Sequence, residues 1–269
     1  MFVDLYGDGI GKVEYVEHMG TDLTVVNSAR VSFGREKSGL DERDKKLIRY
    51  LASHKHTSTF EHNVVTFKFT VPLYIRSQHH RHRTWSYNEI SRRYTDINIR
   101  FYEPDSFRTQ SKSNRQASNK EEKIDPVIVI GKEEVVESAE IKSSASLVGS
   151  ASKILSFHHN NCINIYNSLI ESGICREQAR GVLPQGMYTE YYGTVNLNNL
   201  IKFIDLRIHE GAQFEIQQVA KACLSIAKTL WPYSVSFYMD SNNILEEALL
   251  PVDGQAADLV GQKVDNSPV

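Results

Sequence analysis

The chain has 269 residues, of which 41% are hydrophobic, enough for a sizeable core. Its formal net charge of −2 argues against a general nucleic-acid-binding protein, because such domains are usually strongly basic. The three cysteines form no CxxC pair, and the sequence shows neither a signal peptide nor an apolar run of about 18 residues. We therefore expect one globular domain in the cytoplasm, with no nucleic-acid partner and no membrane contact.

Strand and helix signals alternate near the start of the chain. Val13, Tyr15 and Val16 predict a short strand, and Asp22 begins a predicted helix. Acidic residues in the first turn and an apolar stripe predict a second helix at 41–54. A predicted loop then carries four polar residues, His56, Ser58, Glu61 and His62.

Residues 64–71 alternate apolar and polar side chains, which predicts a half-buried strand. Pro72 is typical of the first turn of a helix. We expect this helix to extend through Arg83 and to hold a cluster of histidine and arginine residues at its end. The polar segment after the cluster is expected to form a loop over a pocket.

The composition changes at 106–152, where Ser, Asn, Lys and Glu are frequent. We expect this segment to be a partly mobile excursion, which the apolar run at 127–130 anchors. Helical spacing resumes at 154–172, and Gly173 is a suitable C-terminal cap. A shorter helix is predicted at 176–183.

The last third of the chain combines one strand with two helices. Aromatic and β-branched residues predict a strand at 188–195. Asn196 can cap the following helix, which ends near Arg207, and a long amphipathic helix is predicted at 214–230. We expect the main domain to occupy residues 1–250 and the polar residues 251–269 to form a disordered tail.

Residues 78–94, QHHRHRTWSYNEISRRY, contain a dense cluster of histidine, arginine and polar side chains. Folding does not require so many basic side chains, which lie either in water or against an anion. Asn88, Glu89 and Ser91 can donate to and accept from the edges of a ligand, which favours a defined pocket. On residue types alone, a solvated basic face remains an alternative.

The segment from Arg81 to Tyr94 resembles the signature of the flavin-dependent thymidylate synthases: RHR is followed by seven residues, a serine, Arg93 and Tyr94. The segments SARVSF, HTSTFEH, REQARGVLP, YTEYYGTVN and LR…AQFEIQQ resemble further blocks of that family, in the same order. The resemblance covers most of the chain outside the excursion and the tail.

This resemblance implies an α+β fold with a central antiparallel or mixed sheet and a helical portion. It also implies reductive methylation of dUMP to dTMP with bound FAD. The one-carbon donor would be 5,10-methylenetetrahydrofolate and the reductant NADPH. Similar proteins are homotetramers whose sites are built from several subunits, so self-association is expected here.

The resemblance also implies two sets of site residues. The residues that would bind dUMP are Gln78, Arg81, Glu89, Ile90, Ser91, Arg92, Arg93, Arg180 and Arg207. The residues that would bind FAD are Ser32, His56, Ser58, Glu61, Arg81, His82, Arg83, Thr84, Asn88, Glu89 and Asn196.

Of these residues, Ser91 and Arg207 are the candidate catalytic groups. Arg207 suits the uracil edge, where a fixed cation polarises the ring, and Arg93 and Arg180 suit the phosphate or ribose. A serine nucleophile needs an adjacent base, so we expect Ser91 to position the uracil ring instead.

Arg92 and Lys202 are among the positions that depart from the family pattern. Many relatives have a smaller residue where Arg92 stands, which affects the expected contact of the loop with the phosphate. Lys202 stands where some relatives use Asn on the adenine side of FAD, and it is therefore left out of the predicted site.

Three other functions fit parts of the sequence. His79, His80 and His82 are metal-ligand types, but the interleaved arginines would repel a cation, so we expect no metal site. Trp85 and Tyr87 could stack on bases in a nucleic-acid-binding segment, but the overall acidity of the chain argues against this function.

Thymidylate can also be formed by enzymes that use a cysteine nucleophile. However, Cys162 and Cys223 fall on apolar helix faces, and Cys175 lies at a helix boundary.

Overall fold

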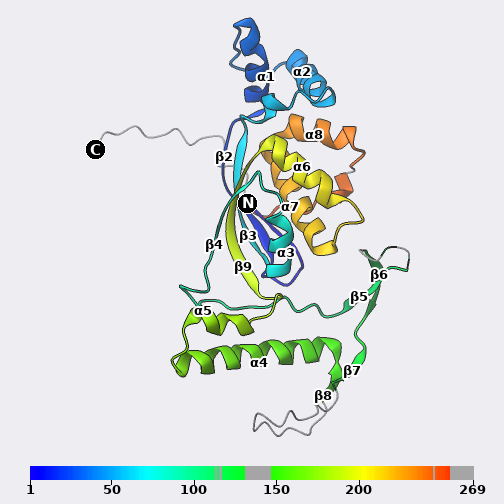
Figure 1. The fold of residues 1–269 in the computed structure, drawn as a ribbon. Helices are drawn as coiled ribbons and strands as arrows, with labels where there is room; N and C mark the ends of the chain where they lie inside the picture. Colours follow the sequence, from blue (N-terminus) through cyan, green and yellow to red (C-terminus); the bar gives the residue numbers. More distant parts are fainter. Residues whose placement is uncertain (113, 115–116, 131–146, 245, 255–269) are drawn as a thin grey trace. The chain divides into compact units, whose positions relative to one another are not determined.

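The computed structural model describes residues 1–112, 114, 117–130, 147–244 and 246–254 (Figure 1). They form two compact units. Unit 1 contains residues 1–71, 75–89 and the described residues from 189 onward. Unit 2 contains residues 72–74 and the described residues of 90–188, which is a longer stretch than the predicted excursion.

A five-stranded sheet forms one layer of unit 1. Its strands lie in the order β1 (Phe2–Asp4), β2 (Lys12–Met19), β3 (Val64–Pro72), β9 (Tyr188–Asn196) and β4 (Ser86–Glu89). The pairs β1/β2, β2/β3 and β4/β9 are antiparallel. The three strands predicted from the sequence are confirmed, and so is the α+β class.

Strand β3 shows why its sequence alternates. The side chains of Val65, Phe67, Phe69 and Val71 are all completely buried, as a strand with one face on the core requires. On the neighbouring β9, a Cβ atom at Gly193 would lie 2.9 Å from Cε2 of Phe69. Only glycine therefore allows this close approach of the strand to the aromatic core.

Helices α1 (Asp22–Arg30) and α2 (Glu42–Ser53) confirm the two N-terminal helix predictions. Asp41 caps α2 by accepting from the backbone N–H groups of Arg43 and Asp44. The carboxylate of Asp44 is completely buried and forms ion pairs with Arg30 and Lys37. This carboxylate therefore ties α2 to the end of α1.

The segments after these helices form short 3₁₀ turns, η1 (Val31–Phe33) and η2 (Thr57–Phe60). The predicted loop after α2 is thus partly helical. Ser28 of α1 contacts η2, because its hydroxyl donates to the carbonyl oxygen of Thr59 at 3.2 Å.

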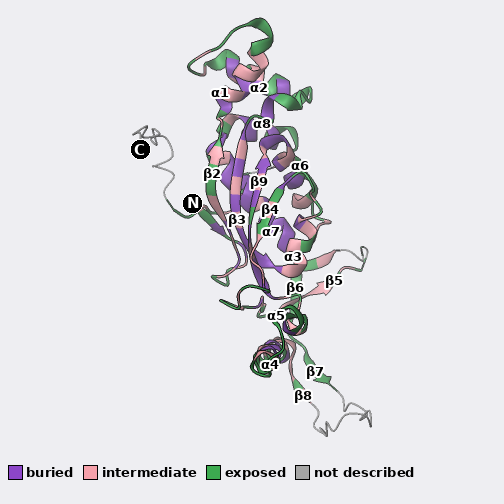
Figure 2. Cartoon of the chain, turned by 60° about the vertical axis from the view of Figure 1, so that its left-hand side comes forward, coloured by how far each residue is buried: buried purple, intermediate pink, exposed green. Residues whose placement is uncertain are grey.

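The helical layer of unit 1 is completed by α6 (Leu197–Ile208), α7 (Phe214–Leu230) and α8 (Pro232–Ser241). Asn196 caps α6 as predicted, with its side chain accepting from the N–H of Asn199 at 2.9 Å. Most of α7 is buried, as Figure 2 shows. The carboxylate of Asp22 accepts from the N–H groups of Tyr233 and Ser234, and so satisfies the first turn of α8.

Unit 2 contains α4 (Ala151–Glu171), α5 (Arg176–Ala179) and η3 (Arg180–Val182). Gly173 ends α4 with a φ of +84°, as predicted. The predicted helix at 176–183 is divided between α5 and η3. His159 of α4 stacks on Phe101 and forms a hydrogen bond with Glu103 at 2.7 Å.

Two antiparallel ribbons form the described part of the excursion. They pair β5 (Phe107–Gln110) with β6 (Ser118–Ile124), and β7 (Val127–Ile130) with β8 (Leu147–Ser150). The apolar run in β7 was expected to anchor the segment, yet all four of its side chains are exposed. Residues 113, 115–116 and 131–146 of the excursion lie outside the described residues.

The basic cluster is held differently from the prediction. Helix α3 (Leu73–His79) ends before the RHR sequence, which follows it in a turn. The polar segment expected as a loop instead forms β4, because Ser86 and its successors pair with β9 from Thr194 downward. The cluster is therefore fixed between a helix and a strand.

The described part of the C-terminal segment returns to the sheet of unit 1. Phe2 and Asp253 exchange two backbone hydrogen bonds, of 2.9 and 2.8 Å. Most of the predicted tail, residues 255–269, lies outside the described residues. Within the described residues, no helix is long and apolar enough to cross a membrane.

Candidate functional site

His79 ends α3 inside an aromatic core. It is completely buried, and its Nδ1 forms a 2.8 Å hydrogen bond with the hydroxyl of Tyr191. Burial, and then the neighbouring histidines and Arg207, lower the pKa of His79 well below its usual range. The ring packs edge-on against Phe69 and Trp85. His79 is thus a neutral core residue that fixes the end of α3.

The turn that follows is tied down by Tyr87 of β4. The Tyr87 hydroxyl donates to the carbonyl oxygens of His79 (3.0 Å) and His82 (3.1 Å). Arg81 and Arg83 in this turn are exposed, whereas His82 between them is half-buried. The turn therefore presents two cations on a fixed backbone, next to the exposed Thr84 and Asn88.

Arg207 reaches back from the last turn of α6 to this turn. Its Nε donates to Nε2 of His82 at 3.0 Å, and its Nη2 donates to the carbonyl oxygen of Gln78 at 3.3 Å. Burial, and then the charge of Arg207, lower the pKa of His82 to about 4, so the imidazole is neutral and can accept. Both acceptors are neutral groups. They orient the guanidinium without neutralising its charge.

The side chain of Gln78 is held by Gln213, the residue that directly precedes α7. Its Nε2 donates to Oε1 of Gln213 at 2.5 Å, and Nε2 of Gln213 donates to the carboxylate of Glu215 at 2.9 Å. Glu215 is 3% exposed. Gln78 and Arg207, both predicted to bind dUMP, are thus neighbours with fixed side chains.

Glu89, at the end of β4, is also held by two partners. Its Oε1 lies 3.1 Å from Nε of Arg76 on α3 and accepts from the hydroxyl of Thr189 on β9 at 2.7 Å. Sequence reasoning missed Arg76 and Thr189, as well as Gln213 and Glu215. The sequence offered one signal for these partners: Glu89 is a carboxylate within a basic segment, and such a group needs a cation when it is partly buried.

Several predicted FAD residues gather around η2 and the start of α6. Oε1 of Glu61 accepts from Nδ2 of Asn198 at 2.7 Å. The ring of His56 is inclined by 24° to that of Tyr50, with 6.0 Å between the ring centres, and Ser58 is exposed in η2. The side chain of Asn196 is engaged as the cap of α6.

A cavity of about 340 Å³ lies beside this group, between α2, η2, α6 and α8. Its walls combine apolar side chains such as Phe60 with the polar side chains of Thr57, Asn198 and Lys202. Lys202, which the prediction left out, therefore lines a cavity next to the predicted FAD residues.

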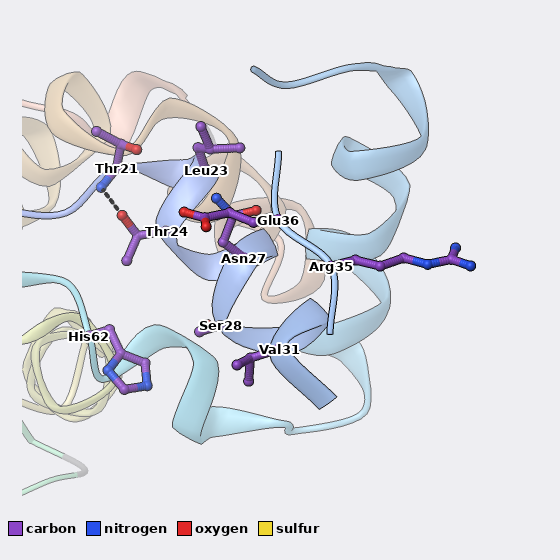
Figure 3. A pocket seen from close by; sticks show the side chains of 9 residues that line it. All are labelled: Thr21, Leu23, Thr24, Asn27, Ser28, Val31, Arg35, Glu36 and His62. Carbon is purple, nitrogen blue, oxygen red and sulfur yellow. Dashed lines mark hydrogen bonds between the residues drawn. The ribbon is translucent and has the colours of Figure 1, made fainter. Parts of the chain in front are cut away.

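A second cavity, of about 580 Å³, lies along α1 (Figure 3). Its polar wall is largely committed to internal contacts. Asn27 exchanges two hydrogen bonds with the backbone of Lys37, and Ser28 donates to backbone carbonyls. The side chain of Arg35 points away from the cavity in Figure 3. Ser32, predicted to bind FAD, is exposed in η1 next to this cavity wall.

The remaining predicted residues belong to unit 2. Oγ of Ser91 accepts from the N–H of Arg93 at 3.2 Å, and Arg93 lies 3.4 Å from Glu177. Arg92 is 7% exposed, and its Nη1 donates to the carbonyl oxygen of Ile97 at 2.6 Å. Arg92 thus contacts backbone in its own loop. Ile90 follows β4 directly and is half-buried, and Arg180 is exposed at the start of η3.

The cysteines have the surroundings that the sequence predicted. Cys223 is completely buried and Cys162 is 6% exposed, and burial raises the pKa of both thiols. Cys175 is exposed at the start of α5. The described residues contain no group of three or more His, Cys, Asp or Glu side chains that could hold a metal ion.

Comparison with known proteins gives consistent matches. The sequence profile of the family described as thymidylate synthase complementing protein matches residues 14–233. The flavin-dependent thymidylate synthase of Thermus thermophilus is 38% identical over 240 residues, which are 89% of this chain and 79% of that protein. That of Thermosipho melanesiensis is 36% identical over 243 residues, covering 89% of this chain and 96% of the relative.

The fold also matches solved structures. A UMP/dUMP methylase of Streptomyces cacaoi, crystallised with 5-Br UMP, superposes with a TM-score of 0.68 and 28% sequence identity. The match covers 93% of this chain and 99% of that one. The profile and the relatives cover most of the chain, and every residue predicted to bind dUMP or FAD lies within the profile match. The protein therefore belongs to the flavin-dependent thymidylate synthase family.

Proposed function

We propose that this protein catalyses the reductive methylation of dUMP to dTMP. FAD is the bound redox cofactor, 5,10-methylenetetrahydrofolate is the one-carbon donor and NADPH is the reductant. The reaction would take place in the cytoplasm as a step of dTMP biosynthesis. Family membership supports this class of reaction. The strongest structural support is that Arg207 is held in a fixed orientation by uncharged partners.

Arg207 has the properties that a uracil ligand requires. Its guanidinium is fixed by His82 and by the carbonyl oxygen of Gln78, neither of which carries charge. The cation is thus available to a carbonyl oxygen of the pyrimidine, where negative charge must accumulate for C5 to become nucleophilic. A preformed cation stabilises that charge without reorganising at the moment of reaction.

The other predicted residues complete the binding of dUMP. Arg93 and Arg180, both exposed cations, suit the phosphate or ribose. Ser91 positions the uracil ring. Its hydroxyl accepts from a backbone N–H, a contact that orients the side chain but does not activate it as a nucleophile. Glu89 is held in place by Arg76 and Thr189 and offers a second carboxylate oxygen to a ligand.

The residues of unit 1 also fit a flavin dinucleotide. The exposed Arg81 and Arg83 suit its phosphates, and the cavity of about 340 Å³ offers apolar walls and amide groups to a ring. When bound, FAD would carry reducing equivalents from NADPH to the one-carbon unit on C5. The roles of the protein are to orient the base, polarise it and exclude water.

We also propose that the protein is a homotetramer. Val31 and Phe33 flank Ser32 in η1 and are 72% and 79% exposed. Two such apolar side chains beside a predicted FAD residue suit coverage by a second copy of the chain. Light scattering tests this proposal, because a tetramer of 30.6 kDa chains is readily separated from a monomer or dimer.

An absorption spectrum of the purified, FAD-reconstituted protein tests the function. Flavin bands should shift when dUMP is added and bleach when NADPH follows under anaerobic conditions, and adding methylenetetrahydrofolate should then yield dTMP. If no flavin binds even after reconstitution, the assignment fails, and the basic segment must bind a different anion.

A further inference from the structure

Three polar side chains connect α7 to the end of α3. Glu215, in the first turn of α7, accepts from Nε2 of Gln213 at 2.9 Å. Gln213 in turn accepts, through Oε1, from Nε2 of Gln78 at 2.5 Å. Of these three residues, only Gln78 was predicted to bind dUMP. The geometry of the three side chains indicates what the other two do.

The direction of this chain follows from the chemistry of its anchor. A carboxylate only accepts hydrogen bonds, so Gln213 must direct its NH₂ group toward Glu215. Its carbonyl oxygen then faces Gln78, and Gln78 must present its own NH₂ group in return. The hydrogen-bond partners of an amide determine which way its oxygen and nitrogen point. Here the partners allow one orientation for each of the two amides.

The carbonyl oxygen Oε1 of Gln78 then occupies the other side of the amide. Arg207 supplies donors at the same residue, because its Nη2 donates to the backbone carbonyl oxygen of Gln78. A uracil edge offers a donor at N3 and acceptors at its two carbonyl oxygens, which complements an acceptor beside donors. Cytosine carries an acceptor at N3 and an amino group at C4, so it would need the reversed amide.

We propose that Gln213 and Glu215 are positioning residues that orient the Gln78 amide and thereby make the site select uracil over cytosine nucleotides. This inference rests on the proposed function, in which Gln78 and Arg207 meet the base of dUMP. Neither Gln213 nor Glu215 needs to touch the nucleotide.

The first test replaces the anchor with its isosteric amide, Glu215→Gln. The new amide can either donate or accept, so Gln213 and Gln78 are released to take both orientations. Titration calorimetry on the FAD-loaded enzyme should show the ratio of the dissociation constants for dCMP and dUMP falling about tenfold or more. Glu190→Gln is the matched control. It removes a carboxylate that pairs with Lys68 elsewhere on the sheet, and it should leave the ratio unchanged.

A transposed double variant separates orientation from packing. In Gln213→Glu with Glu215→Gln, an acceptor-only carboxylate again faces the NH₂ group of Gln78, and the amide behind it donates to that carboxylate. We expect the double variant to recover most of the discrimination that Glu215→Gln loses. A role limited to packing gives no reason for such recovery.

Gln213→Met provides a second route in case Glu215→Gln fails to fold, because Gln213 is only half-buried. It should weaken discrimination by a similar factor. A ratio that stays at the wild-type value in the variants that fold would overturn the proposal while leaving the proposed function intact. If the FAD-loaded wild-type enzyme binds no dUMP, both are overturned.

Discussion

The candidate residues of unit 1 and those of unit 2 are held in different ways. In unit 1, Gln78, Glu89 and Arg207 each bond to a side chain from another segment of the chain. In unit 2, Arg93 pairs with an exposed carboxylate, and Arg92 bonds to its own loop. Groups that read the edge of a base need fixed directions, whereas a phosphate is bound well by exposed cations that adjust to it. We therefore expect substitutions behind the unit 1 residues to cost more activity than equivalent ones in unit 2.

The largest effect should come from Arg207→Ala. Loss of the one cation that His82 and Gln78 orient should reduce kcat/KM for dUMP by about 100- to 1000-fold while FAD stays bound. Steady-state kinetics with a flavin absorbance check measure both. Arg207→Lys keeps the charge but not the fork of donors, so it should recover only part of the loss. Unchanged kinetics would remove Arg207 from the site.

Removing the partner of Glu89 should have the next largest effect. Arg76→Met leaves a half-buried carboxylate without its cation, and we expect kcat/KM to fall by about 10- to 100-fold. Lys68→Met is the control, since it breaks the comparable 2.7 Å ion pair with Glu190 in the same sheet. Equal losses in the two variants would mean that Arg76 acts on folding and not on Glu89.

The hydrogen bond between Arg207 and His82 predicts that the affinity for dUMP falls at acidic pH. The folded pKa of His82 is about 4, below the ordinary 6.5, because burial and Arg207 disfavour the imidazolium. The stability that neutral His82 gives to the folded protein is therefore fully present above pH 6.5 and is lost as the pH falls toward 4. At about pH 4 the protonated ring can no longer accept from Arg207, so dUMP affinity should drop several-fold. His82→Gln keeps an acceptor that does not titrate, and its affinity profile should lack this step. A step that persists in the variant would assign it to another group.

The smallest effect is expected at the unit 2 ion pair. Glu177→Gln removes the exposed carboxylate 3.4 Å from Arg93, and exposed pairs contribute little. The dissociation constant of dUMP should stay within about threefold of wild type, changing toward tighter binding because Arg93 loses a competing anion. A loss of affinity as large as that of Arg76→Met would contradict the distinction between the two units.

The sequence predicted what depends on local periodicity. The alternation in β3, the long helix α7 and the position of Arg207 near the end of α6 all follow from neighbouring residues. The end of α3 and the existence of β4 could not be predicted from neighbouring residues, because β4 forms by pairing with β9, about a hundred positions away in the chain. The contacts of Gln78 with Gln213 and of Glu89 with Thr189 were missed for the same reason.

A crystal structure of the FAD-loaded protein with dUMP would show directly whether Arg207 and Gln78 bind the uracil edge. We predict that an Nη of Arg207 and Oε1 of Gln78 lie within about 3 Å of the uracil edge, with Gln78 still bonded to Gln213. A uracil ring bound away from both side chains, or a Gln78 amide turned away from Gln213, would contradict this prediction.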